Sequence, residues 1–355
     1  MARQMETEPT DFFDNLPEWA LQANQSVTYP RTFLETAVSH GASRDVALLQ
    51  AGLPLDALDT PANRISFVQL LRLLEALQLQ VPEHPIGFES GLQQPLTAHG
   101  SLGYALLCAG SPREAIRILE RFWHLRSRAV ALMIHWSGDY IFFEICPHMP
   151  LPESLQEALF SAILASVCQG VAFMTPSLPR DPEIWLQGPE PPGFEAVASR
   201  LPKVRFRMPS AGFVLYGDQD WLDMPLPTAN PEALAQAIEQ CERESTLQEP
   251  MDNIVLQVRT ALKPGRDGYP DPEELAGQLH LTPRTFRRRL REQGQSYRQL
   301  LEEARRRDSC DMLDHTDISV HRIGELLGYT EPANFTRAFR SWTGMTPSQW
   351  RFRNR

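Results

Sequence analysis

The chain has 355 residues, more than a single hydrophobic core ordinarily organises, so two or three domains are expected. Hydrophobic residues make up 42% of it and charged residues 22%, which excludes a disordered or fibrous protein and is typical of a globular one. The formal net charge is −10 at pH 7, so any contact with nucleic acid would depend on the placement of individual cations rather than on overall charge.

Cysteine usage and the N-terminal residues indicate the compartment. The five cysteines are dispersed, with no CxxC motif and no His and Cys pair at zinc-ligand spacing, which argues against a disulfide framework and for a reducing environment. The opening stretch MARQMETEPTDFFDNLPEW has no apolar segment of signal-peptide length. We find no apolar run of 18 residues that would predict a transmembrane helix. These features predict a cytoplasmic protein with no membrane partner.

The first third of the chain predicts a tail followed by helices. Residues 1–26 have the composition of a flexible polar tail. Beyond them, apolar residues recur at three- and four-residue spacing, which predicts helices over residues 31–41, 45–53, 66–80 and, as a pair, 99–125. Between the members of the pair, Ser111 can cap the second helix and Pro112 fits its first turn.

The hydrophobic period then changes to that of strands. Two β-prone runs meet at Gly138-Asp139 and predict a hairpin over residues 129–146. Residues 154–174 predict a long, largely buried helix. Short strands at 183–188, 203–209 and within 211–227, a helix at 193–201, and a helix at 230–245 capped by Asn230 complete this part. We therefore expect an α+β domain over residues 27–245, followed by an all-α domain over residues 246–355.

The C-terminal domain differs from the rest in charge. Residues 250–355 hold 18 Lys and Arg against 14 Asp and Glu, a net of +4. Residues 1–249 hold the remaining 16 against 30, a net of −14. An asymmetry of this kind indicates that the two parts have different partners.

A weak internal repeat predicts two helix-turn-helix units, at about residues 272–294 and 320–344. EELAGQLHLTPRTFRRRLREQG aligns with HRIGELLGYTEPANFTRAFRSWTG at an offset of 48 before the turn and 49 after it. In each unit, Thr and Pro in the turn can cap and begin the second helix. That helix carries apolar residues four apart, Phe286 and Leu290 or Phe335 and Phe339, and its opposite face is left free.

The free faces carry the chemistry of DNA recognition, because Arg can pair with guanine, Asn with adenine, and Thr with a thymine methyl group or a phosphate. The candidate DNA-binding residues are Arg284, Arg287, Arg288 and Arg291 in the first unit and Asn334, Thr336, Arg337 and Arg340 in the second. The helix expected over residues 297–313 would hold both reading helices on one face of double-stranded DNA. Its Arg305, Arg306 and Arg307 are expected to be partly solvated, with one of them near a phosphate. A lone Arg-rich helix face is more often a solvated surface, but here the repeat, the turns and the ending GMTPSQWR favour DNA.

These stretches resemble the DNA-binding domain of AraC/XylS-type transcriptional regulators. The most specific of them is ISVHRIGELLGYTEPANFTRAFRSWTGMTPSQWR. The resemblance implies seven helices and promoter binding that usually activates transcription, hence a contact with RNA polymerase. It also implies base or backbone contacts at the positions of Arg284, Arg287 and Arg288 in the first unit and of Asn334, Thr336 and Arg337 in the second. Residues 28–245 resemble the non-cupin arabinose-binding-like regulatory domain of some of these regulators. That resemblance implies sensing of a small-molecule effector or self-association as a homodimer, without fixing arabinose as the ligand.

Little else in the N-terminal domain predicts chemistry. Aromatic residues are dense in its β region and some could line a pocket for an apolar or amphipathic metabolite: Trp136, Phe142, Phe143, Trp185, Phe206, Phe213, Tyr216 and Trp221. The histidines show no metal-ligand spacing, and His99 is expected to serve a turn or packing. No nucleophile elbow, P-loop or dinucleotide motif is present, so no catalytic residue, metal or cofactor is predicted.

Two other functions remain open at this point. The chain could be a regulator that needs no ligand and acts by dimerisation alone. It could also be an enzyme with an attached DNA-binding module, such as an alkyl-transfer repair regulator, although its cysteines lie too far apart in sequence to favour this reading.

Overall fold

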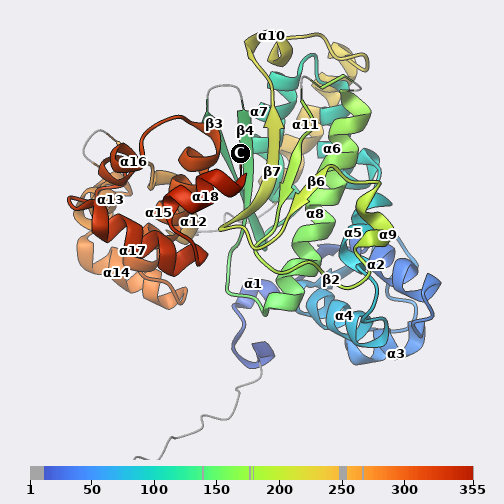
Figure 1. The fold of residues 1–355 in the computed structure, drawn as a ribbon. Helices are drawn as coiled ribbons and strands as arrows, with labels where there is room; N and C mark the ends of the chain where they lie inside the picture. Colours follow the sequence, from blue (N-terminus) through green and yellow to red (C-terminus); the bar gives the residue numbers. More distant parts are fainter. Residues whose placement is uncertain are drawn as a thin grey trace, which may run out of the picture.

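The computed structural model describes residues 12–354 apart from 138–139, 176, 179, 248–253 and 266–267. An α+β domain is followed by an all-α domain with two helix-turn-helix units, so the fold class predicted from the sequence is confirmed (Figure 1). The two domains lie side by side, with a sheet of the first facing the helices of the second.

A five-stranded sheet is the centre of the N-terminal domain. Its strand order is β3-β4-β7-β5-β6, and β5 and β6 form its parallel pair. β3 and β4 pair antiparallel as expected for a hairpin, although Gly138 and Asp139 themselves lie outside the described residues. The strands are β3 (Val130–Ser137), β4 (Tyr140–Pro147), β5 (Glu183–Trp185), β6 (Lys203–Arg205) and β7 (Ala211–Tyr216).

The central strands are covered on both faces. Successive side chains of a strand point to opposite sides. In β4, Ile141 and Phe143 join the core of the N-terminal domain, whereas Tyr140 and Phe142 join a second cluster with the C-terminal helices. Because neither face meets water, β4 and β7 are nearly continuously apolar instead of alternating with polar residues.

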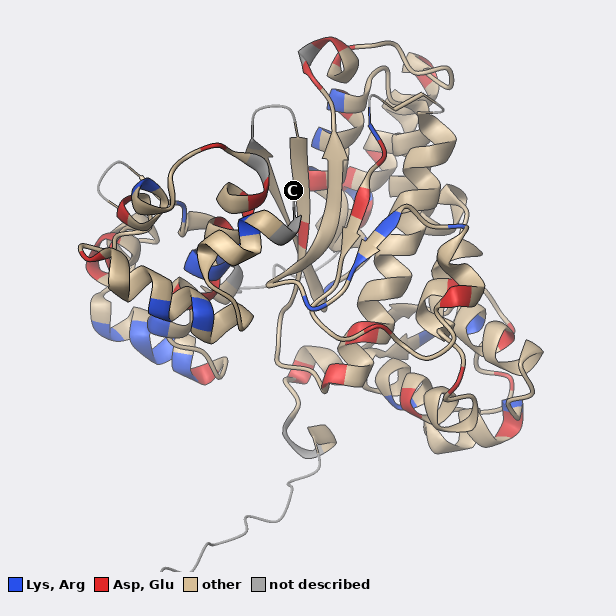
Figure 2. Ribbon diagram, in the orientation of Figure 1, with Lys and Arg blue, Asp and Glu red and all other residues tan. Residues whose placement is uncertain are grey.

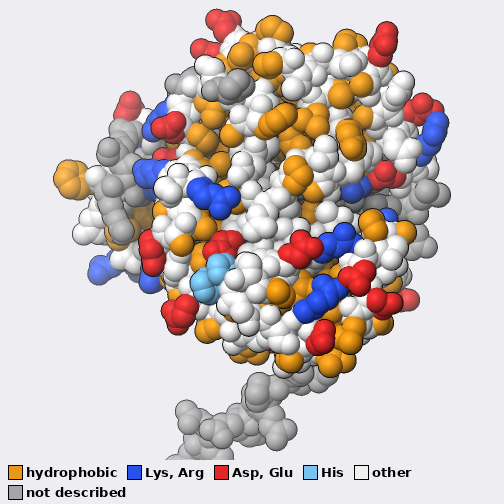
Figure 3. All heavy atoms as spheres, turned by 90° about the vertical axis from the view of Figure 1, so that its right-hand side faces the viewer, with side chains coloured by type: hydrophobic (Ala, Val, Ile, Leu, Met, Phe, Trp, Pro, Cys, Tyr) orange, Lys and Arg blue, Asp and Glu red, His pale blue; other side chains and the backbone are white. Residues whose placement is uncertain are grey.

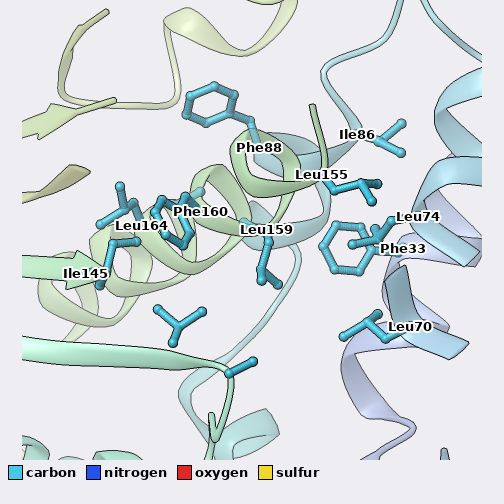
Figure 4. Packing of buried hydrophobic residues seen from close by; sticks show 14 of the residues in the cluster. Phe33, Leu70, Leu74, Ile86, Phe88, Ile145, Leu155, Leu159, Phe160 and Leu164 are labelled. Carbon is cyan, nitrogen blue, oxygen red and sulfur yellow. The ribbon is translucent and has the colours of Figure 1, made fainter. Parts of the chain in front are cut away.

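Helix α8 (Glu153–Met174) lies along the inner face of the sheet, and its Leu159, Phe160 and Leu164 lie among side chains from other elements (Figure 4). By length and composition alone an 18-residue window of it could cross a membrane. The sequence-based expectation that no segment of this length is apolar enough to span a membrane did not account for this window. Of the window, 61% is buried inside the protein, so α8 is the core helix of a folded domain.

Helix α5 (Ile86–Leu92) crosses α8 at very short range. A Cβ atom at Gly87 would lie 2.5 Å from the carbonyl oxygen of Ala158, and one at Gly91 would lie 2.3 Å from that of Ala162. Glycine is therefore required at both positions for this crossing. The remaining helices of this layer are α2 (Thr28–Ser39), α3 (Arg44–Gln50), α4 (Phe67–Gln80), α6 (Gly100–Cys108) and α7 (Pro112–Phe122).

The described part of the expected tail is folded. Residues 12–26 contain a 3-10 turn (Phe12–Asn15), α1 (Glu18–Leu21) and β1 (Ala23–Ser26). β1 pairs antiparallel with β2 (Arg64–Ser66), and Trp19 stacks on Phe67 with ring centroids 5.6 Å apart. A loose tail therefore does not extend through these residues, because a partner strand about 40 residues away holds them.

Short segments close the domain. α9 (Glu195–Ala198) and α10 (Gln219–Leu222) flank β6 and β7, and α11 (Pro231–Leu247) leads towards the C-terminal domain. The predicted caps are present: the Ser111 side chain accepts a hydrogen bond from the Glu114 backbone N–H, and Asn230 accepts one from Ala233.

Seven helices make up the C-terminal domain among the described residues. They are α12 (Ile254–Ala261), α13 (Pro272–Gln278), α14 (Pro283–Glu292), α15 (Tyr297–His315), α16 (Val320–Leu326), α17 (Pro332–Thr343) and α18 (Pro347–Asn354). α13 and α14 pack around Phe286, whereas α16 and α17 pack around Phe335 and Phe339.

Helix α15 also contacts the N-terminal domain. The hydroxyl group of Tyr140 donates to the carboxylate of Asp311. A guanidinium nitrogen of Arg307 lies 3.3 Å from a carboxylate oxygen of Glu144, and both side chains are buried. The same helix that joins the two helix-turn-helix units therefore covers the outer face of the sheet.

Candidate nucleic-acid interface

The first unit begins each helix with a side-chain cap. Asp271 and Glu274 form a reciprocal capping box at α13. At α14, the Thr282 hydroxyl accepts a hydrogen bond from the Thr285 backbone N–H, and Pro283 occupies the first helical position. The turn chemistry predicted for this unit is confirmed.

The two units share the same turn geometry. The residue that ends the turn of α13 or α16 has a positive φ, 53° at His280 and 77° at Gly328. The next backbone N–H then donates to the carbonyl group five residues earlier, at 2.8 Å in the first unit and 2.9 Å in the second. The repeat detected in the sequence is thus a structural repeat.

The second unit departs from the prediction at one cap. Pro332 is the first residue of α17, which makes Glu331 its N-cap, and Glu331 provides no side-chain hydrogen bond there. The expectation that Thr330 caps α17 is wrong. The extra residue in this turn places Thr330 one position too early.

The predicted division of α14 into two faces is present. Phe286 and Leu290 are buried, whereas Arg284, Arg287, Arg288 and Arg291 are all exposed. Arg289 lies at the edge between the faces and is half-buried. Figure 2 shows the resulting cluster of cations on α14, at the end of the molecule away from the N-terminal domain.

Helix α17 shows the same division with a different composition. Phe335 and Phe339 are buried, and their rings meet edge to face at 5.9 Å. Asn334, Arg337 and Arg340 are exposed on the other side, and Thr336 is half-buried. The eight candidate residues thus fall on the second helices of the two units, α14 and α17.

Several of these side chains pair with neighbours on the surface. Arg287 lies 2.9 Å from Glu273, and Arg288 lies 2.6 Å from Glu292. Exposed pairs of this kind contribute about 0–1 kcal/mol, so a phosphate or a base edge could replace the acidic partner at small cost. By contrast, cations and anions are interspersed on the face of the N-terminal domain seen in Figure 3.

Arg305 and Arg306 of α15 are partly exposed, as expected, whereas Arg307 is buried, and all three side chains make contacts within the protein. Arg305 donates from Nε to the carbonyl oxygen of Leu327 at 2.9 Å. Arg306 donates to the carbonyl oxygen of Pro209 in the N-terminal domain. Arg307 is buried in the ion pair across the domain contact. All three stabilise the arrangement of the protein itself.

The N-terminal domain contains an apolar cavity of about 160 Å³ between α8, α7 and the inner face of the sheet. Three of the eight aromatic residues suggested by the sequence line it: Phe143, Phe213 and Trp221. Phe142, Trp185 and Tyr216 instead face the C-terminal domain, and Trp136 is 48% exposed. His99, which was expected to serve a turn or packing, also lines the cavity. Tyr29, Arg126 and Ser166 line it as well, and no sequence pattern predicted these three residues.

One group of described side chains has the chemistry of a metal site. His40, His84 and Glu89 place their donor atoms within 4.8 Å of one another. The imidazoles of His40 and His84 stack with centroids 3.7 Å apart, and His40 Nε2 lies 2.6 Å from Glu89. The sequence reading found no metal spacing because His84 lies 44 positions after His40.

Two helix-turn-helix units with exposed cationic and amide side chains define a DNA-binding transcription regulator. A family model described as the N-terminal arabinose-binding domain of AraC transcription regulators matches residues 41–226, and a helix-turn-helix domain model matches residues 275–353. The chain belongs to the AraC family of transcriptional regulators.

Known proteins that are similar to this chain are named as regulators. The ornithine utilization regulator of Pseudomonas aeruginosa is 27% identical over 327 residues, which cover 92% of this chain and 95% of that protein. An uncharacterized HTH-type transcriptional regulator of Mycobacterium tuberculosis is 29% identical over 336 residues, 90% of this chain and 94% of that one. The crystal structure of the regulator CdpR from Pseudomonas aeruginosa aligns with 22% identity and a TM-score of 0.39, covering 78% of this chain and 91% of that chain.

Proposed function

We propose that this protein is a one-component, sequence-specific transcription activator, controlled by a small-molecule effector and acting in the cytoplasm. It binds double-stranded promoter DNA through α14 and α17 and promotes the action of RNA polymerase there. The supporting observation is that both second helices expose base-reading side chains from one chain, joined by one uninterrupted helix. The DNA-contacting residues of the proposal are Arg284, Arg287, Arg288, Arg291, Asn334, Thr336, Arg337 and Arg340.

The position of α15 supports control by the N-terminal domain. α15 is 19 residues long and holds the two units relative to each other. The same helix packs against the outer face of the sheet, through Tyr140–Asp311 and Glu144–Arg307 contacts. A change in the position of β4 would therefore move α15, the helix that sets the spacing of α14 and α17.

Fluorescence anisotropy of labelled DNA tests the DNA-binding part. The full chain should bind a fragment from upstream of its own gene or of the neighbouring genes more tightly than a shuffled fragment of equal composition. Affinity should fall steeply with salt, because cations on α14 and α17 displace counterions. An equal affinity for both fragments across the salt series would contradict sequence-specific binding.

Arg288→Ala tests the role of one reading side chain. If Arg288 reads a base, its removal should cost about 1–3 kcal/mol of binding free energy and relax specificity at one base pair. Arg200→Ala is the matched control, since it also removes an exposed arginine, but from the N-terminal domain. Equal effects of the two substitutions would mean that only overall charge is sensed.

The sign of regulation and the assembly state need separate measurements. A reporter gene driven by the bound promoter should be expressed more strongly when the protein is present. Two reading helices in one chain allow a monomer to occupy two successive grooves, so light scattering on the free and DNA-bound protein distinguishes this from a homodimer.

A further inference from the structure

The interior of the N-terminal cavity suits an apolar group. Its wall is formed by side chains from α2, α4, α7, α8 and the sheet, including Phe33, Leu70, Ile116, Leu159 and Phe213. Figure 4 shows Phe33, Leu70 and Leu159 coming from three different helices. A dry cavity of about 150 Å³ lined by such residues is large enough to admit benzene. The volume of about 160 Å³ found here therefore fits one ring or one medium alkyl chain.

One end of the cavity is polar and leads outward. Gln25, Tyr29, Gln94 and Arg126 line both the apolar cavity and an adjoining outer pocket. The outer pocket is lined by polar side chains such as Asn24, Ser26, Thr28 and Thr32. The shared residues thus lie between the two pockets, and we place the mouth of the cavity there, where an apolar body would end and a polar group would begin.

The charge at this mouth is positive. Burial, together with the charge of Arg126, lowers the pKa of His99 to about 4, so its imidazole is neutral at pH 7. Burial raises the pKa of Tyr29 to about 12, so its hydroxyl is neutral as well. Among the residues that line the outer pocket, Arg64, Arg126 and Arg128 carry positive charge and Glu244 is the acidic residue.

Arg126 has donor capacity left at the mouth. One of its terminal nitrogens lies 2.8 Å from a carboxylate oxygen of Glu244. Its buried Nε–H has no hydrogen-bond partner among the described residues. Behind it, Tyr29, His99 and Ser166 form a connected chain, with 2.8 Å between Tyr29 Oη and His99 Nδ1 and 2.9 Å between His99 Nε2 and Ser166 Oγ. An unpaired buried donor is costly, and an anion at this point would remove that cost.

We propose that the cavity binds a small amphipathic carboxylate, with its apolar ring or alkyl chain inside and its carboxylate at Arg126. This rests on the proposed function in that it names the class of effector, although binding itself can be measured without DNA. A pentose fits poorly, because each hydroxyl group buried among Phe, Leu and Ile side chains would lose its hydrogen bonds. The family name refers to arabinose, and the lining of this chain's cavity does not suit that sugar.

The bound carboxylate competes with Glu244 for Arg126. Glu244 belongs to α11, the last described helix before residues 248–253 and the C-terminal domain. Two further contacts hold the same end of α11: Arg121 lies 2.7 Å from Glu242, and His124 Nε2 lies 3.0 Å from Ser245 Oγ. Occupancy of the cavity therefore weakens one of the polar contacts that hold this end of α11 among the described residues.

A series of eight-carbon probes tests the head group on the full, unmodified chain. Octanoate, 1-octanol, octylamine and L-arabinose would be titrated while tryptophan fluorescence and the melting temperature are recorded, since Trp123 and Trp221 line the cavity. We expect octanoate to bind at least about tenfold more tightly than octanol, octylamine to bind more weakly than octanol, and arabinose not to bind. Equal affinities for octanoate and octylamine, or preferential binding of arabinose, would overturn the proposal.

Two substitutions locate the binding. Arg126→Gln should reduce the affinity for octanoate to that for octanol and leave the affinity for octanol unchanged. Arg121→Gln is the matched control, because it also removes an ion pair to α11 but does not line the cavity. Val167→Phe, which adds volume to the lining of the cavity, should abolish binding of both probes. Full octanoate affinity in Arg126→Gln, or equal losses in Arg126→Gln and Arg121→Gln, would overturn the proposal even if the other variants failed to fold.

DNA binding measured without any probe separates this proposal from the proposed function. If octanoate does not bind but sequence-specific DNA binding is observed, the cavity assignment is wrong and the regulator assignment stands. If octanoate binds as described but the chain shows no sequence preference on DNA, the carboxylate site stands and the proposed function fails.

Discussion

Replacing Arg307 with Ala should weaken the contact between the two domains severely. Arg307 is 7% exposed and Glu144 is 5% exposed, so the substitution would leave a buried carboxylate that only His135 and the charge of Arg259 still stabilise among the described residues. A buried charge that loses its partner cannot regain the hydration that it gave up on folding.

The size of the effect follows from the geometry. The guanidinium nitrogen of Arg307 lies 3.3 Å from the Glu144 carboxylate oxygen. At an effective dielectric constant of about 20, two unit charges at that separation attract by roughly 5 kcal/mol. Breaking a buried pair by removing one partner typically costs about 3–5 kcal/mol, so we expect Arg307→Ala to lower the free energy of unfolding by that amount.

Urea unfolding followed by circular dichroism measures this loss, and a double-mutant cycle assigns it. The double variant Arg307→Ala, Glu144→Ala should be less destabilised than the sum of the two single variants, by up to about 3 kcal/mol. Arg44→Ala is the matched control, since its pair with Asp59 is exposed and should contribute less than about 1 kcal/mol. Additive single effects, or a loss no greater than that of Arg44→Ala, would refute the reasoning.

The pH dependence of the free energy of unfolding tests the same Glu144–Arg307 interaction. Burial alone would raise the pKa of Glu144, but Arg307 and His135 hold it below its ordinary range. A carboxyl group with a lowered folded pKa stabilises the protein above its unfolded pKa, and this stability is lost as the pH falls through the folded value. In Arg307→Ala the effect of burial prevails and the pKa rises. The difference in stability between wild type and variant should therefore be largest near neutral pH and shrink below about pH 4.

Two glycine comparisons test the backbone arguments by thermal or urea unfolding. Gly328→Ala should destabilise the protein by about 1–2 kcal/mol, because φ is 77° there, whereas His280→Gly at the equivalent turn should stabilise it by up to about 1 kcal/mol. If both changes shift stability in the same direction, the left-handed turn is not the cause. Gly91→Ala should cost about 1–3 kcal/mol by pressing on the backbone of Ala162, while Gly277→Ala, with open space around its Cβ, should be neutral or stabilising by up to about 1 kcal/mol. A tolerated Gly91→Ala would contradict the close crossing of α5 and α8.

The exposed arginine face of α14 could be predicted from the sequence because its signals are local. The cap Thr282, the first-turn Pro283 and the pair Phe286 and Leu290 lie within nine residues, and helical periodicity then places the arginines on the opposite side. The repeat supplied an independent second example. The one cap predicted wrongly, at Thr330, lies where the second unit has an additional residue in its turn.

The cavity and the domain contact could not be predicted because their members come from distant parts of the chain. Tyr29 meets His99 across 70 positions, and Arg307 meets Glu144 across 163. No period or spacing links such residues, so the charged stretch around Arg307 looked like a solvated or phosphate-binding face. The aromatic-rich strands did indicate a pocket, but strand alternation divides their side chains between two faces that composition does not distinguish.

Because their side chains alternate between two faces, β4 and β7 contact both the cavity and the C-terminal domain. Phe143 of β4 pairs with Phe213 of β7, and both side chains line the cavity. Phe142 and Glu144, which flank Phe143 in β4, face the C-terminal domain. Protein interiors are packed at nearly crystalline density, so a strand shifted by a ligand on one face must repack its other face. We expect the buried Glu144–Arg307 pair to pass such a shift on to α15, because the two charges lose attraction when they separate. Under the proposed function, we therefore expect the spacing of α14 and α17 to depend on what fills the cavity, because a single sheet separates the cavity from α15.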